Sequence, residues 1–129
     1  MMNNYPAEHY GMVIFASGGI GWQGYYIGDK DGDGVSARLP DFANTLEDVV
    51  KKTGKKIDVL IGSCAVNMIE IAYELQNSVN YIVGTQDCLP ETHIMPIFFN
   101  AVSKLKNDTG LTPEEFAIQG PLSLSLIHI

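Results

Sequence analysis

The sequence predicts an α/β fold in which a mostly parallel sheet carries helices on both faces, giving three layers. Short and nearly all-apolar stretches, typical of buried parallel strands, alternate with segments whose apolar residues recur at helical spacing. Successive parallel strands joined through helices require right-handed crossovers, which cover both faces of the sheet. The 129-residue length fits one small domain of this kind.

Individual elements follow from local patterns. Three apolar stretches predict strands, at residues 11–16, 57–62 and 81–85. Four segments predict helices: residues 39–50 with Gly54 as the stop, residues 66–76, residues 92–105, and a short helix after Thr112. The last has a clear start signal, because Thr112 and Glu115 form a capping box around a proline at the first helical position.

Three loops follow the three predicted strands. They are residues 17–24, the short turn around Cys64, and residues 86–93. In a parallel sheet the carboxyl ends of the strands meet at one edge, where open α/β sheets carry their sites. We therefore expect these loops to converge.

Cys64 lies in the turn between the second predicted strand and the following predicted helix. The unpaired N–H groups and the macrodipole at a helix N-terminus favour the thiolate form, which is the reactive nucleophile. The alternative is a buried structural thiol, since free cysteine is often buried. The position favours Cys64 as a candidate nucleophile.

The segment from Cys64 resembles the nucleophile segment of the clostripain family of cysteine peptidases, which have a caspase-like fold. The residues that fit are Cys64, Met68, Glu70, Ile71, Ala72, Tyr73, Glu74 and Leu75. Residues 10–15 followed by 17–22 resemble the family's strand and histidine loop, and residues 80–85 with Pro90 resemble its next strand and loop. The resemblance covers roughly residues 8–106.

This resemblance implies a peptide or protein substrate, cleaved after basic residues by thiolate attack with a histidine base, and a secreted or cell-surface bacterial location. Two positions depart from the family pattern. The catalytic histidine aligns with Gly18, and the acidic residue that selects basic side chains aligns with Gly62. A cysteine without a base is a weak nucleophile, so we expect impaired peptidase activity. The alternatives are a non-catalytic pseudoenzyme or binding module on the same fold, and an incomplete gene product.

His93 is the candidate substitute base, because it lies on the third of the converging loops. Its alternative is a surface histidine beside a helix start. His9 precedes the first strand and therefore belongs to the opposite edge of the sheet, which makes it a poor candidate.

Asp29, Asp31 and Asp33 have the spacing of the first half of an EF-hand calcium loop, with Gly34 at the sixth position. The twelfth position is Pro40 instead of the bidentate glutamate. We therefore favour a solvated acidic turn, with calcium as the alternative, and predict no other cofactor. A Cys64–Cys88 disulfide matches no redox spacing and is not favoured.

Composition excludes several function classes. The net charge of −7 argues against nucleic acid as a partner, because binding it requires a basic face. The chain contains no 18-residue apolar run, so we expect no membrane span. The N-terminal residues lack the basic and apolar regions of a signal peptide. Oligomeric state and redox compartment stay open.

Residues 124–129 match the translation of a transposase adapter used in sequencing libraries. We expect this tail to be non-native and residues 1–123 to be a truncated fragment of a peptidase domain. The alternative is a genuine apolar C-terminal strand.

Overall fold

The computed structural model describes residues 2, 4–14, 27–28, 36–63, 65–87, 91–119 and 125–128. The strands are β1 (Gly11–Ile14), β2 (Ile27–Gly28), β3 (Ser36–Ala37), β4 (Ile57–Gly62), β5 (Val79–Gly84) and β6 (Ser125–His128). The helices are α1 (Leu39–Thr53), α2 (Ile69–Leu75), α3 (Glu91–Asn107) and α4 (Pro113–Gln119).

The main sheet has the strand order β1-β4-β5-β6. β4 pairs in parallel with both β1 and β5, whereas β6 pairs antiparallel with β5. The prediction of an α/β fold with a mostly parallel sheet is confirmed. The predicted strand at 57–62 has the observed bounds of β4, whereas β5 begins at Val79, two residues before the prediction.

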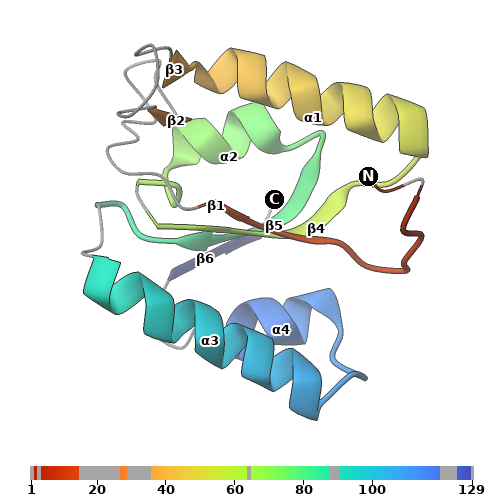
Figure 1. Cartoon of the computed structure of the whole chain (residues 1–129). Coiled ribbons are helices and arrows are strands. Elements are labelled where there is room, and N and C mark those ends of the chain that lie inside the picture. The colour runs from red at the N-terminus through yellow and green to blue at the C-terminus, as the bar shows by residue number, and fades with distance from the viewer. Residues whose placement is uncertain are drawn as a thin grey trace.

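Helices α1 and α2 lie on one side of the sheet, and α3 and α4 lie on the other (Figure 1). Two apolar clusters correspond to these two sides. Because side chains alternate along a strand, Leu60 of β4 joins one cluster while its neighbours Val59 and Ile61 join the other. The first cluster includes Leu46 of α1 and Ile71 of α2. The second includes Ala101 of α3 and Phe116 and Ala117 of α4.

The end of α1 follows the sequence prediction. Gly54 has φ of 70°, a left-handed conformation that glycine adopts without a Cβ clash. Its N–H donates to the carbonyl of Val50 at 2.7 Å and so satisfies one of the free carbonyls at the helix end. Gly54 therefore ends α1, as expected.

The predicted helix at 66–76 is shorter than expected, because α2 begins only at Ile69. Val66 and Asn67 are buried in the preceding turn, and the N–H of Asn67 donates to the carbonyl of Thr85. This contact with the end of β5 replaces the bonding that would extend the helix. The macrodipole acts within about the first turn of a helix, so its effect at Cys64 is smaller than the sequence suggested.

Helix α4 begins with the predicted capping box. The N–H and hydroxyl of Thr112 each donate to Glu115 Oε2 at 2.9 Å, and the N–H of Glu115 donates to the Thr112 hydroxyl at 3.2 Å. The hydrogen bonds from the Thr112 backbone and then from its side chain lower the pKa of the Glu115 carboxyl below its ordinary value. The capping box therefore favours the ionised form of Glu115.

Strands β2 and β3 form a separate antiparallel pair that the sequence did not predict. Each strand has only two residues, too few for an alternating pattern. The pair joins Ile27 with Ala37 and Gly28 with Ser36 across the connecting residues 29–35. The candidate calcium ligands belong to that connection.

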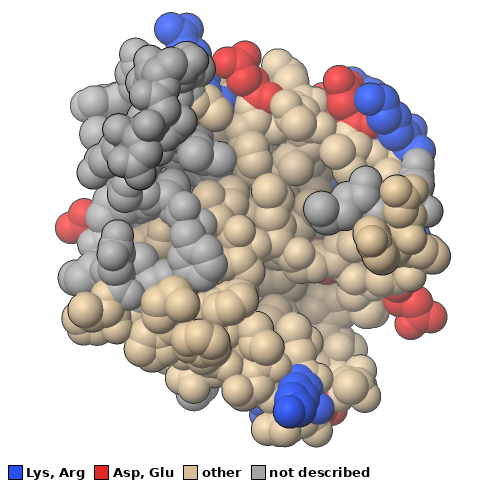
Figure 2. All heavy atoms as spheres, in the orientation of Figure 1, with Lys and Arg blue, Asp and Glu red and all other residues tan. Residues whose placement is uncertain are grey.

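On the face in Figure 2, charged side chains gather at the margins, along α1 and toward the ends of the lower helices. The described part of this face presents no broad basic surface. None of the helices in the described part of the chain is long and apolar enough to cross a membrane.

Candidate functional site

The carboxyl ends of β1, β4 and β5 lie together at one edge of the sheet. In the β-ladder Ile14 is opposite Gly62, and Ile61 is opposite Val83. The three strands therefore end side by side, and the segments that follow them start from the same edge, as the sequence predicted for parallel strands.

The turn from β4 to α2 is bonded to the end of β1 and to the segment that follows β5. The N–H of Ser63 donates to the carbonyl of Ile14 at 3.3 Å, at the end of β1. On the other side, the N–H of Ala65 donates to the carbonyl of Asp87 at 3.4 Å. Because these two residues flank Cys64, the backbone on each side of the candidate nucleophile has a defined attachment.

Cys64 itself lies outside the described residues, but its neighbours describe an unusual turn. Ser63 is buried, with 5% of its surface exposed. Ala65 has φ of 45°, in the left-handed region that non-glycine residues seldom adopt. Such strain costs on the order of 1 kcal/mol and persists only where the surroundings enforce it, often at functional sites. The turn therefore supports the hypothesis that Cys64 has a functional role.

Val66 fills a recess between the ends of β4 and β5. A Cβ atom at Gly62 would overlap its two methyl groups, and a Cβ atom at Gly84 would overlap its Cγ2. Val66 is 2% exposed and β-branched, so it has little freedom to move aside. Because Gly62 and Gly84 have no side chains, they leave the space that Val66 occupies.

This packing limits which residue can occupy position 62, which the family resemblance aligns with the acidic selector. Any side chain at position 62 would begin inside the space that Val66 occupies. A carboxylate there would require a different residue at Val66, or a displaced turn. The glycine at position 62 and the valine at position 66 are therefore physically linked in this chain.

Asn67 is a buried polar residue that sequence reasoning missed. Its Nδ2 donates to the carbonyl of Gly84 at 3.5 Å, while its Oδ1 is buried and has no hydrogen-bond partner among the residues that the structure describes. An unpaired buried acceptor costs about 1–3 kcal/mol. Asn67 follows Cys64 by three positions, but no sequence pattern signals a buried amide, because burial depends on tertiary contacts.

His93 lies in the first turn of α3 with its side chain exposed, and its Nδ1 is 3.4 Å from the hydroxyl of Thr92. Its role as a base for Cys64 stays a prediction. His9 lies at the opposite edge of the sheet, as expected, where its Nδ1 is 3.5 Å from Asp58 Oδ2. Asp58 also accepts the N–H of Tyr10 at 2.8 Å, which ties the N-terminal segment to β4.

Several sequence predictions fall outside the described residues. These concern Gly18, Asp29, Asp31, Asp33 and Cys88. Within the ranges that the structure describes, no group of three His, Cys, Asp or Glu side chains could hold a metal ion. Calcium binding therefore stays a prediction from the aspartate spacing.

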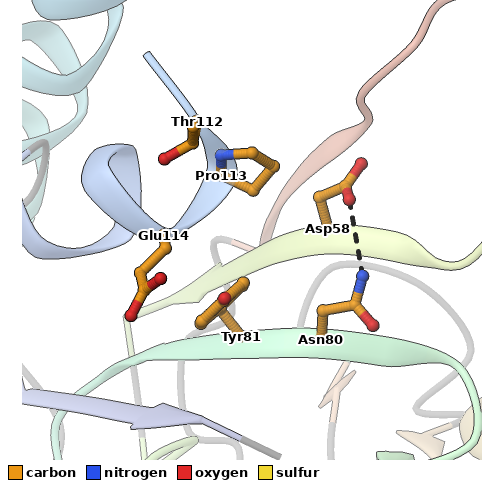
Figure 3. A pocket seen from close by; sticks show the side chains of 6 residues that line it. All are labelled: Asp58, Asn80, Tyr81, Thr112, Pro113 and Glu114. Atoms are coloured by element: carbon orange, nitrogen blue, oxygen red, sulfur yellow. Dashed lines mark hydrogen bonds between the residues drawn. The ribbon is translucent and has the colours of Figure 1, made fainter.

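A polar cavity of about 340 Å³ lies at the opposite, amino edge of the sheet (Figure 3). Its lining residues are Asp58, Asn80, Tyr81, Thr112, Pro113 and Glu114. Asn80 Nδ2 donates to Asp58 Oδ1 at 3.4 Å, so a side-chain hydrogen bond joins β5 to β4 beside the cavity. The cavity lies beside the first residues of β4 and β5, whereas the turn of Cys64 follows the last residue of β4. The two sites are therefore at opposite edges of the sheet.

A family model described as the clostripain family matches residues 1–117. Comparison with curated proteins gives no match, and neither does comparison with solved structures. The matched range includes β1, β4, β5 and the turn that contains Cys64, and it confirms the resemblance seen in the sequence. The chain belongs to the clostripain family.

Proposed function

We propose that this chain is a cysteine peptidase-like domain in which Cys64 is the nucleophile for peptide-bond cleavage. Membership of the clostripain family supports a cysteine peptidase-like function with protein substrates. The observation that carries the assignment to Cys64 is its turn, bonded on one side to β1 and on the other to the segment after β5. Those bonds hold the flanking backbone at the edge where open α/β sheets carry their sites.

The fold that goes with this proposal is the three-layer caspase-like arrangement implied by the family resemblance. The parallel strands β1, β4 and β5 and the helices on two sides of the sheet support it (Figure 1). In that arrangement Gly18 follows β1 along the chain, and His93 follows β5, in the first turn of α3 and not in the loop that the sequence predicted. Each would approach the turn of Cys64 from one side.

Catalysis requires a base for the thiol, and the family's histidine aligns with Gly18. A cysteine without such a base is in general a weak nucleophile, so we propose weak activity. His93 is the alternative base. A second proposed function, a non-catalytic binding module, gains support from the same glycine and from Val66, which occupies the space beside the aligned selector position.

A labelling experiment with a peptidyl acyloxymethyl ketone tests the proposed function. The probe carries Arg or Lys at its first position, and the protein carries Cys88→Ser so that one thiol remains. We expect slow, saturable labelling that disappears in a Cys64→Ala variant. A non-peptidyl ketone serves as the control for simple thiol reactivity. Equal rates with both ketones would remove the peptidase proposal and leave the binding module.

A further inference from the structure

Asn67 stands out because two of its groups bond to the same neighbouring segment. Its backbone N–H donates to the carbonyl of Thr85 at 3.1 Å, and its Nδ2 donates to the carbonyl of Gly84 at 3.5 Å. Both acceptors lie where β5 ends. Together with the bond from Ala65 N–H to Asp87, they bind the turn of Cys64 to the chain that follows β5.

Packing alone leaves part of this arrangement unexplained. Val66 already fills the recess between the strands. Asn67 is itself buried, with 5% of its surface exposed. An apolar residue at position 67 would avoid the buried, unpaired Oδ1. The amide is thus a poor choice for stability, which points to a role for its donor group.

We propose that Asn67 is a positioning residue for Cys64, whose amide holds the β4–α2 turn against the end of β5 and so keeps the backbone on the C-terminal side of the nucleophile in place. This inference rests on the proposed function, since it assumes that Cys64 attacks a peptide. It differs from that proposal in assigning the attachment of the nucleophile's turn to a residue that need not touch the substrate.

The left-handed Ala65 is consistent with such a role. A residue with φ of 45° relaxes unless the chain on both sides is held. Ser63 is held by β1, and Asn67 is held by the end of β5. Removing the amide of Asn67 would weaken the second attachment while leaving the first intact.

The test compares Asn67→Ala with Ser78→Ala, both in a Cys88→Ser background. Ser78 is the matched control, because its Oγ is also buried with no hydrogen-bond partner in the described part of the chain. It lies in the tight turn between α2 and β5, before the strand begins. Asn67→Leu is the second variant, which keeps the site filled. Amide hydrogen exchange and thermal unfolding are measured for all of them.

We expect the exchange protection of the amides at positions 65 and 67 to fall about tenfold or more in both Asn67 variants. The amides of β4 should keep their protection within about twofold, and Ser78→Ala should leave all of these amides unchanged. Unchanged protection at positions 65 and 67 would overturn the inference. Protection lost equally throughout the chain would also overturn it, because it would show general destabilisation.

The second readout is labelling of Cys64 by the peptidyl ketone, separated into the maximal rate and the half-saturating concentration. In the Asn67 variants we expect the maximal rate to fall about fivefold or more with half-saturation changed less than about twofold. Iodoacetamide, which needs only access to the thiol, should react at an equal or faster rate. A maximal rate that survives the local loss of protection would overturn the positioning role.

If the parent chain takes no peptidyl label, the proposed function fails separately from this inference. The comparison of iodoacetamide rates then decides it. We expect alkylation of Cys64 about threefold faster or more in Asn67→Ala than in Ser78→Ala, because a turn that opens more often gives the reagent more frequent access. Equal alkylation rates would overturn the inference.

Discussion

Val66 lies against Gly84 so closely that a Cβ atom at position 84 would overlap its Cγ2 methyl and come within 3.0 Å of the carbonyl oxygen of Gly62. We expect Gly84→Ala to destabilise the fold by about 1–3 kcal/mol, as overpacking of a filled core does. Urea unfolding gives the measurement. Gly11→Ala is the matched control, because its new Cβ would meet only ordinary contact, 3.9 Å from the Val59 carbonyl oxygen.

A double variant tests whether Val66 is the cause. Combining Gly84→Ala with Val66→Ala should cost less than the sum of the two single changes, because the smaller side chain makes room for the new methyl group. Additive costs would show that Val66 is not what excludes a side chain at position 84.

Selectivity for basic residues should be weak. Gly62 cannot attract a guanidinium group, and Asp87 at the same edge is exposed, where an ion pair contributes about 0–1 kcal/mol. We expect a preference of less than about tenfold for Arg over a neutral side chain of similar shape. The cleavage rates of a peptide library that varies the residue before the cleaved bond provide the measurement. An Arg-only profile would reveal a buried carboxylate elsewhere.

Restoring the aligned base should raise activity. A general base contributes on the order of 10²–10⁴ in rate, so Gly18→His should increase peptide turnover by about 10²-fold or more. The control is the same change combined with Cys64→Ala, which should abolish the gain. Conversely, activity in the unmodified chain that His93→Ala eliminates would identify His93 as the base.

The capping box of α4 should make stability depend on pH. Hydrogen bonds from Thr112 lower the pKa of Glu115 in the folded chain, so its contribution is present above the ordinary value of 4.5. That contribution is lost as the pH falls through the lowered pKa. The stability difference between the parent and Glu115→Gln should therefore shrink between near-neutral pH and pH near 3. A difference independent of pH would contradict the role of the carboxylate.

Deleting residues 124–129 should leave the fold intact. In the described chain, all members of both apolar clusters lie within residues 2–117. The deletion therefore removes the backbone pairing of β6 with β5 but none of these side chains. We expect a cooperative thermal transition in the shortened chain. Loss of that transition would favour the alternative of a genuine C-terminal strand.

Local chemistry explains which elements the sequence could predict. The apolar run ends at Gly62 and the helix α1 is capped by Gly54. In both cases the residue that ends the element is visible in the local sequence, and both ends are where the sequence predicted them. The capping box at Thr112 involves residues three positions apart, so its partners are visible in the sequence. Such short-range signals do not depend on the rest of the fold.

The start of α2 and the role of Asn67 could not be predicted in the same way. Val66 and Asn67 fit a helical pattern, but contacts with Gly84 and Thr85 place them in a turn instead. Those contacts cross about 17 positions of the chain, as the Asn67–Gly84 bond shows. The sequence therefore located the candidate nucleophile, whereas the geometry around it depends on how two strands meet.

The parallel pairing of β4 with its two neighbours also implies an order of assembly. The bond between Asp58 and Asn80, which joins β4 to β5, spans 22 positions, whereas the bond between Tyr10 and Asp58, which joins the start of β1 to β4, spans 48. Closing the shorter loop loses less chain entropy. The β4–α2–β5 unit, with the turn of Cys64 inside it, should thus form early in folding, and β1 should dock onto it afterwards.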